Sequence, residues 1–275
     1  MKEIVLTALG GVENFAVRNA SSQVVPHGSI RVRNSAVGVN FIDIYQRRGL
    51  YPVAVPCVLG QEGAGVVDEA GAGSPFRKGE RVAYLSGAGA YAEKTVVSAA
   101  VASRIPDRVS DESAAASFLK GLTADMLLHD VFPLNSGHSA LITAAAGGVG
   151  TILTQWAAHL GARVIAVVGG PAKVSVAKEN GASDVIDRST TPDVATEVRR
   201  LTNGRGVDVA YDSVGAATFE SSLNSLALRG MMVTYGNASG PVPPVAPLEL
   251  ARRGSLSLVR PTLFHYATPD RLPEM

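Results

Sequence analysis

Residues 140–173 read ALITAAAGGVGTILTQWAAHLGARVIAVVGGPAK. An apolar run, a glycine-rich turn, an amphipathic segment and a second apolar run follow one another, which is the order of a dinucleotide-binding strand–helix–strand unit. Two positions depart from that pattern. Ala145 stands where such turns carry their first glycine, and Gly169-Gly170 ends the second strand where an acidic residue is expected.

The glycines of the turn are explained by a bound phosphate. A Cβ atom in such a turn would meet the backbone or a pyrophosphate, and the helix that follows offers free N–H groups and a positive dipole end. Gly147, Gly148 and Gly150 satisfy the later part of the motif. The alternative is that they only allow close packing. The strands on either side, and the later turns YDSVG and YGNASG, favour a ligand site.

The missing acid predicts which cofactor is bound. An acidic residue about 20 positions beyond the turn accepts hydrogen bonds from the ribose of NAD and would repel a 2′-phosphate. Gly169 occupies that place, and Lys173 follows it. A glycine leaves room for a phosphate and a lysine neutralises it, so we expect NADP(H) rather than NAD(H). The alternative for Lys173 is a solvated surface lysine.

Composition limits the class of protein. The 275 residues are long enough for about two domains, and 25 basic residues balance 24 acidic ones. No basic run predicts binding to nucleic acid or to an anionic membrane. The single cysteine, Cys57, excludes an internal disulfide and a multi-thiolate zinc site. There is no secretory signal and no apolar run of membrane-spanning length, so we expect a cytoplasmic protein.

The pattern of the chain changes near residue 110. Before it, short alternating strands such as SIRVRNSAVGVN and GAGVVDEAG are separated by glycines, which predicts an antiparallel β domain. After it, helical segments alternate with the apolar strands ALIT, RVIAVV, DVID, VDVAYDSV, MMVTYG and SLSLVR. This alternation predicts an α/β domain with a doubly wound parallel sheet.

Six motifs occur in a family order: NFIDIYQRRGLYP, VLGQEGAGVV, ASFLKGLTA, AAAGGVG, YDSVG and YGNASG. With them the chain resembles the zinc-independent, zeta-crystallin-like quinone oxidoreductases of the medium-chain dehydrogenase/reductase superfamily. The resemblance covers nearly the whole chain. It implies a GroES-like catalytic domain in residues 1–118, a Rossmann-type NADP-binding domain in residues 119–262, NADPH between the two, and a homodimer.

The residue types argue against a catalytic zinc ion. Zinc-dependent relatives carry a Cys-x-Thr/Ser-Asp segment and a Gly-His-Glu segment, where this chain has Asn40 and Gln61. Neither side chain is a good zinc ligand, and we expect no metal site. Cys57 is interpreted as a small apolar residue.

Asn40, Tyr45 and Tyr51 are the candidate catalytic residues, which would hold the nicotinamide and donate hydrogen bonds to a developing quinol oxygen. The alternative is that the tyrosines pack and that Tyr51-Pro52 forms a turn. Asp43 is expected to pair locally with Arg47 or Arg48.

The resemblance, together with the glycine and lysine described above, predicts a set of cofactor-binding residues. Arg188 departs from the tyrosine that relatives often carry, so its guanidinium would stack on the adenine or hold the phosphate. The predicted contacts are Asn40, Phe41, Tyr45, Thr123, Ala146, Gly147, Gly148, Val149, Gly169, Lys173, Arg188, Ser213, Gly236, Asn237, Arg260, Pro261, Thr262 and Leu263.

The expected function is NADPH-dependent reduction of a quinone. Two alternatives stay open, namely reduction of enoyl or alkenal double bonds, and a non-catalytic NADPH-binding, crystallin-like protein. Family members usually continue for some tens of residues beyond RLPE to complete the β domain, so residues 263–275 are expected to begin a shortened return segment. We expect this shortening to impair activity.

Overall fold

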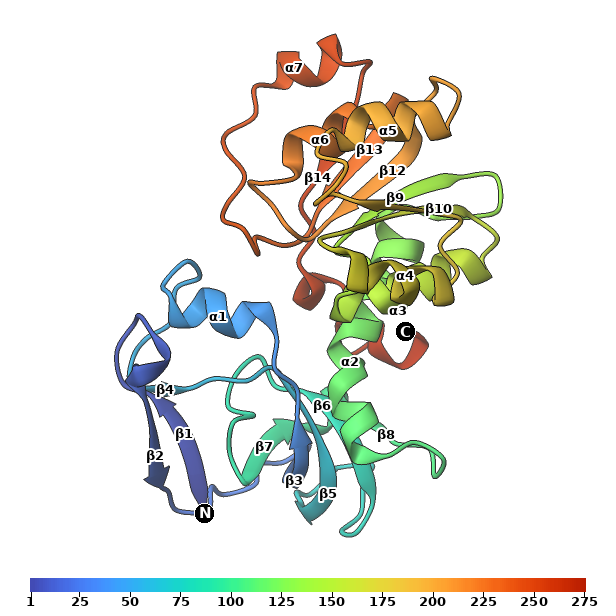
Figure 1. Ribbon diagram of the computed structural model, residues 1–275. Helices are drawn as coiled ribbons and strands as arrows, with labels where there is room; N and C mark the ends of the chain where they lie inside the picture. Colours follow the sequence, from blue (N-terminus) through green and yellow to red (C-terminus); the bar gives the residue numbers. More distant parts are fainter. The chain divides into compact units, whose positions relative to one another are not determined.

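A computed structural model describes all 275 residues, and the chain divides into two compact units. Unit 1 contains Met1–Leu119 and Ala267–Met275, and unit 2 contains Lys120–Tyr266. Unit 1 is built on antiparallel strands, and unit 2 consists of a sheet with helices on its faces (Figure 1). No helix has the length and apolar character needed to cross a membrane.

Unit 1 contains two antiparallel sheets. The larger has the order β7-β3-β5-β6-β8, and the smaller has the order β2-β1-β4. The strands are β1 (Lys2–Leu6), β2 (Phe15–Asn19), β3 (Ser29–Val37), β4 (Cys57–Val58), β5 (Glu62–Ala70), β6 (Arg81–Leu85), β7 (Lys94–Ser98) and β8 (Ala102–Arg104). The helices are α1 (Phe41–Arg47), the beginning of α2 (Asp111–Asp125), and the 3-10 turns η1 (Val12–Asn14), η2 (Ala99–Val101) and η6 (Leu272–Glu274).

The core of unit 1 is formed by apolar side chains that its strands direct inward. Ile30 and Val32 of β3 point inward and pack with Val67, Val82 and residues of neighbouring strands. Successive residues of a strand face opposite sides, so in the first half of β3 buried residues alternate with partly exposed ones.

Unit 2 is organised around one parallel sheet of six strands in the order β11-β10-β9-β12-β13-β14. The strands are β9 (Ser139–Thr143), β10 (Arg163–Val168), β11 (Asp184–Asp187), β12 (Val207–Asp212), β13 (Leu226–Thr234) and β14 (Ser257–Val259). The helices are α3 (Gly148–His159), α4 (Val174–Glu179), α5 (Val194–Leu201), α6 (Phe219–Asn224), α7 (Pro247–Arg252), the π-helical turn η3 (Met126–Val131), and the 3-10 turns η4 (Pro171–Lys173) and η5 (Leu263–His265). The predicted α/β class is confirmed.

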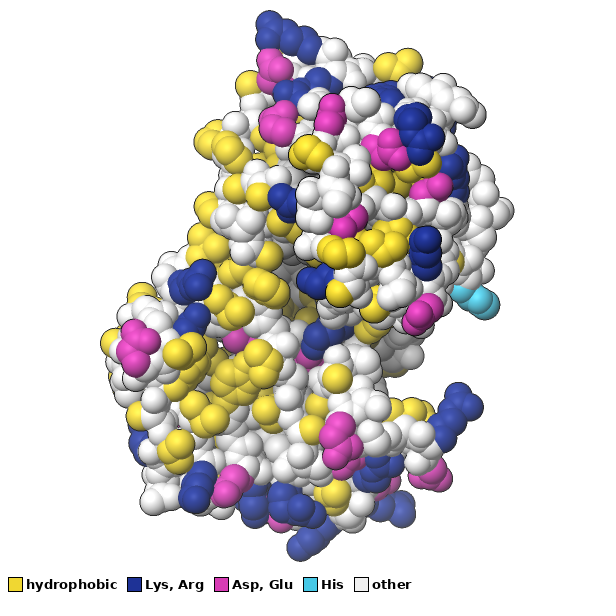
Figure 2. All heavy atoms as spheres, in the orientation of Figure 1, with side chains coloured by type: hydrophobic (Ala, Val, Ile, Leu, Met, Phe, Trp, Pro, Cys, Tyr) yellow, Lys and Arg dark blue, Asp and Glu magenta, His cyan; other side chains and the backbone are white.

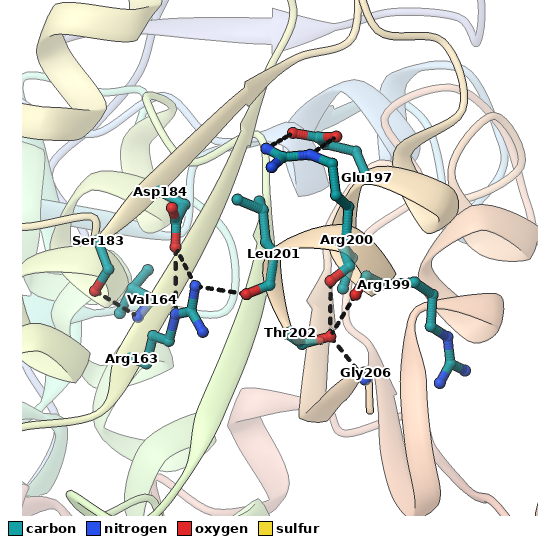
Figure 3. A network of polar contacts seen from close by, with 11 residues as sticks. Arg163, Val164, Ser183, Asp184, Glu197, Arg199, Arg200, Leu201, Thr202 and Gly206 are labelled. Atoms are coloured by element: carbon teal, nitrogen blue, oxygen red, sulfur yellow. Dashed lines mark hydrogen bonds and ion pairs between the residues drawn. The ribbon is translucent and has the colours of Figure 1, made fainter. Parts of the chain in front are cut away.

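Charged side chains connect the amino ends of two neighbouring strands in unit 2. Arg163 at the start of β10 binds the Asp184 carboxylate at the start of β11 with an N–O distance of 2.9 Å, and also donates to the carbonyl of Leu201 (Figure 3). Beside it, the Thr202 hydroxyl accepts from the N–H of Gly206. These contacts lie at the amino ends of the strands, and the glycine turn lies at the opposite, carboxyl ends.

Some elements differ from the sequence-based expectation. The strands β1, β2, β4 and β8 were not predicted, and β13 begins at Leu226 rather than at residue 231. Most side chains of β2 are exposed, so its apolar content gives little periodic signal.

Candidate functional site

The turn after β9 is shaped by close backbone contacts. Ala144 adopts a φ of 49°, in the left-handed region, and Gly147 begins α3 as its N-cap. A Cβ atom on Gly150 would lie 2.2 Å from the carbonyl oxygen of Ala144. Ala145 is fully buried, and its N–H donates to the Val167 carbonyl of β10. The alanine at the first motif position is thus accommodated, while Gly150 cannot be replaced without moving backbone.

The turn leads directly into a helix of 12 residues. The first N–H groups of a helix have no partner within it, and they lie at its positive end. Of the predicted turn residues, Gly147 and Gly148 are exposed, and Ala146 and Val149 are half-buried. This end of α3 is therefore suited to an anion such as a pyrophosphate.

Two exposed cations flank the end of β10. Gly169 is exposed, and a Cβ atom placed there would have nothing within 4 Å. Lys173 ends the turn that follows, and Arg188 is held beside β10 because its N–H donates to the Val168 carbonyl. Neither cation makes an ion pair. The carboxylate of Asp187 accepts from the N–H and hydroxyl of Ser189. This corner of unit 2 presents open space and positive charge.

The turns after β12 and β13 lie against each other. A Cβ atom on Gly236 would approach the Ser213 carbonyl oxygen to 2.2 Å, so these two predicted site residues are neighbours. The β12 turn is held by Asp212, whose fully buried carboxylate accepts from the N–H groups of Val214 and Gly215. The same carboxylate accepts from the hydroxyls of Thr218 and Ser222.

Arg260 holds the second of these turns. Its Nη1 donates to Thr234 Oγ1 at 3.1 Å and to the Gly236 carbonyl at 3.0 Å. The surrounding donors and acceptors orient the Asn237 amide so that its oxygen accepts from Arg260 Nη2 and its nitrogen donates to Gly236. The guanidinium therefore organises the loop. In the segment after it, Pro261 and Leu263 are buried and Thr262 is exposed.

Thr123 lies in the part of α2 that belongs to unit 2, where it is buried. One turn earlier, the Lys120 stem lies against the glycine turn, because a Cβ atom on Gly148 would be 3.0 Å from Lys120 Cδ. The unit 2 residues of the predicted site thus lie on α2, at the carboxyl ends of the strands β9 to β13, and just after β14.

The predicted site residues of unit 1 are grouped on α1 and the turn that follows it. Asn40 is the N-cap of the helix. The Tyr45 ring packs edge-on against Tyr51, with 5.3 Å between centroids, and lies 6.1 Å from the Phe41 ring. Figure 2 shows hydrophobic side chains gathered at the surface on the α1 side of unit 1, where Phe41 and Leu50 are exposed. The structure brings Asn40, Phe41, Tyr45 and Tyr51 together.

The predicted local ion pair of Asp43 is wrong. The side chain is buried and accepts from the Asn40 N–H and from the Tyr91 hydroxyl, each at 2.8 Å, instead of reaching Arg47 or Arg48. Burial raises the pKa of Asp43, and the hydrogen bonds from Asn40 and Tyr91 oppose that rise. Burial, followed by the nearby Asp43 charge, raises the pKa of Tyr91. The buried Asp43 carboxylate thus fixes the start of α1 through its hydrogen bond with the Asn40 N–H.

Sequence reasoning missed three buried polar residues: Gln61, Glu62 and Asp212. Gln61 Nε2 donates to Gln46 Oε1 of α1 at 3.2 Å, and Glu62 binds Asn40. The GQE motif is the local signal for this pair, and it bears on metal binding as well as on these hydrogen bonds. No group of three or more His, Cys, Asp and Glu side chains lies close enough to hold a metal ion. Cys57, interpreted as an apolar residue, is half-buried, and burial raises its pKa.

Known proteins share both the sequence and this architecture. Residues 26–107 match the alcohol dehydrogenase GroES-like domain, and residues 148–273 match the zinc-binding dehydrogenase family. A quinone oxidoreductase of Pseudomonas aeruginosa is 45% identical over 278 residues, which cover 100% of this chain and 85% of that protein. The chain belongs to the quinone oxidoreductase family.

Other members support the assignment. The crystal structure of Escherichia coli quinone oxidoreductase complexed with NADPH has a TM-score of 0.96 and 41% identity, with 100% of this chain and 85% of that chain covered. A 2-haloacrylate reductase of a Burkholderia species is 42% identical over 94% of this chain and 80% of that protein. The resemblance deduced from the motifs is confirmed.

Gly150 provides a direct test of the turn in this family member. We expect Gly150→Ala to lower the free energy of unfolding by about 1–3 kcal/mol, because the new methyl group collides with the backbone of residues 144 and 145. Urea unfolding followed by circular dichroism measures the change. Gly121→Ala in α2 is the matched control, since its Cβ meets nothing within 4 Å and alanine favours a helix. Equal stability of the two variants would contradict the contact.

Proposed function

We propose that the protein is an NADPH-dependent quinone reductase. The observation that carries this proposal is the positively charged corner formed by Gly169, Lys173 and Arg188, in a member of the quinone oxidoreductase family. The chemistry that NADPH supplies when bound is hydride donation from its nicotinamide ring. The protein binds and orients the reactants.

The residues of unit 2 fit this cofactor. The glycine turn leaves N–H groups at the start of α3 for the pyrophosphate, through Ala146, Gly147, Gly148 and Val149. Lys173 and Arg188 are unpaired charges that suit a 2′-phosphate, and Gly169 leaves it space. The remaining candidates for ribose and nicotinamide contacts are Thr123, Ser213, Gly236, Asn237, Arg260, Pro261, Thr262 and Leu263.

Unit 1 provides polar groups for the reacting end. We assign hydrogen bonding toward the acceptor to Asn40, Tyr45 and Tyr51, and further contact with the cofactor to Asn40, Phe41 and Tyr45. A quinone suits this set because it is already electrophilic and the negative charge formed spreads over its ring. Its apolar ring also suits the hydrophobic surface around α1.

A second activity is favoured by one relative. The 2-haloacrylate reductase of the Burkholderia species acts, by its name, on an activated double bond. The second candidate function is therefore reduction of α,β-unsaturated carbonyl compounds, with the same cofactor. Binding of NADPH without reduction of either acceptor class would indicate a non-catalytic, crystallin-like protein.

Steady-state turnover tests the proposal. With NADPH and 1,2-naphthoquinone we expect oxidation of NADPH, followed by its absorbance at 340 nm, and slower rates with acrylate or enal acceptors. Faster turnover of the double-bond acceptors would favour the second function. Tight NADPH binding with no turnover on any acceptor would contradict both.

Lys173 is expected to determine cofactor preference. Lys173→Ala removes one of two cations from the corner, so NADPH affinity should fall about tenfold or more while NADH affinity changes little, since only NADPH carries the 2′-phosphate. Fluorescence titration of both nucleotides measures this. Lys178→Ala, at the end of α4, is the matched control. Equal losses of affinity for NADPH and NADH would contradict the assignment of Lys173 to the 2′-phosphate.

We also propose that the protein is a cytoplasmic homodimer. The edge strand β14 pairs only with β13, and the exposed Leu228 lies beside Gly254, shortly before β14. A second copy would cover such an edge. Sedimentation equilibrium should give twice the chain mass of 28.4 kDa, and Leu228→Asp should give the single mass. A wild-type monomer at micromolar concentration would contradict the dimer.

A further inference from the structure

The Glu62 carboxylate joins two helices inside unit 1. It is fully buried at the first residue of β5. Its Oε1 accepts from Asn40 Nδ2 at 2.9 Å, and its Oε2 accepts from the N–H of Leu119 in α2 at 2.7 Å. Each oxygen thus has a defined donor, one at the start of α1 and the other on α2.

The backbone beside this carboxylate leaves space for it. A Cβ atom on Gly38 would lie 2.2 Å from Glu62 Oε1 and 2.5 Å from its Cδ. The N–H of Gly38 also donates to the Glu62 carbonyl at 3.2 Å. Gly38 precedes Asn40 by two residues, so the chain that enters α1 is shaped around the Glu62 side chain.

This contact determines which way the Asn40 amide faces. The Asn40 amide nitrogen, and not its oxygen, faces Glu62 and donates to the carboxylate. The Asn40 side chain also faces the N–H of Asp43 in a capping box, and its own N–H donates to the Asp43 carboxylate. The amide nitrogen carries two hydrogens. One donates to Glu62, and the second makes no hydrogen bond within the protein.

We propose that Glu62 is a positioning residue that holds the Asn40 amide as a hydrogen-bond donor toward a carbonyl oxygen of the bound acceptor. The proposal rests on the proposed function, which places Asn40 at the reacting end. It adds the residue that fixes the direction in which the Asn40 amide donates. The amide donates rather than accepts, so the site favours acceptors that carry a carbonyl oxygen.

Glu62→Gln reverses one of the two hydrogen bonds while keeping the size of the side chain. If its oxygen stays on the Leu119 N–H, its Nε2 faces the Asn40 amide, donor against donor, and the amide must turn its oxygen inward. We expect kcat/KM for 1,2-naphthoquinone to fall about tenfold or more, with the fold retained. Glu69→Gln, on the same strand with a half-exposed carboxylate, is the matched control and should stay within about twofold of wild type.

A double variant separates orientation from stability. In Asn40→Asp combined with Glu62→Gln, the new carboxylate accepts from the new amide, so pairing is restored with its direction reversed. We expect the thermal midpoint to return toward wild type while quinone turnover stays low. Recovery of turnover in the double variant would overturn the proposal, because it would show that the packing of this pair matters and its polarity does not.

A spectroscopic readout does not depend on turnover. In protein labelled with [¹⁵N]asparagine, the two side-chain hydrogens of Asn40 should resonate far apart, since only one is bonded to the carboxylate. The separation should narrow to that of a solvent-exposed asparagine in Glu62→Gln and persist in Glu69→Gln. If wild type reduces no quinone, the proposed function fails, whereas this separation still decides the amide orientation. A separation in wild type no larger than that of a solvent-exposed asparagine would overturn the positioning role even if quinone turnover is normal.

Discussion

Parallel pairing of β9 with β10 and β12 is the constraint on which the nucleotide site depends. Parallel strands all run in the same direction, so the chain must return across a face of the sheet between one strand and the next, usually through a helix. The carboxyl ends of all the strands therefore lie along one edge of the sheet. Residues distant in sequence, from Ala146 to Asn237, therefore follow the carboxyl ends of neighbouring strands. The position of the glycine turn at the centre of the sheet follows from the strand order and not from the turn itself.

Hydrophobic pattern and turn chemistry were sufficient to predict the sheet of unit 2, because buried parallel strands are short apolar runs bounded by glycine. The same signals failed for β2, whose residues are mostly exposed. They also could not show that Arg260 would bind the loop after β13, since a side chain that reaches from one strand to another leaves no local periodicity. The motif NFIDIYQRRGLYP predicted that Asn40 and Tyr45 lie close to each other. Their roles toward ligands remain predictions.

The buried acids show most clearly where sequence reasoning ends. An aspartate or glutamate is usually exposed, and the motifs that contain Asp43, Glu62 and Asp212 do not show that these side chains are buried. In the structure each accepts several hydrogen bonds, and together they fix the start of α1 and the turn after β12. A buried carboxylate that accepts hydrogen bonds from the backbone holds that backbone more precisely than apolar packing, because hydrogen bonds specify direction.

The clamp of Arg260 on the loop after β13 has a thermodynamic consequence. Loops that order only when a ligand arrives lose conformational entropy at that moment, and this loss weakens binding. Here Thr234, Gly236 and Asn237 are held by a guanidinium in the folded chain itself. Their ordering is therefore a cost of folding rather than of association, so substitutions that loosen this loop should weaken stability and ligand affinity together.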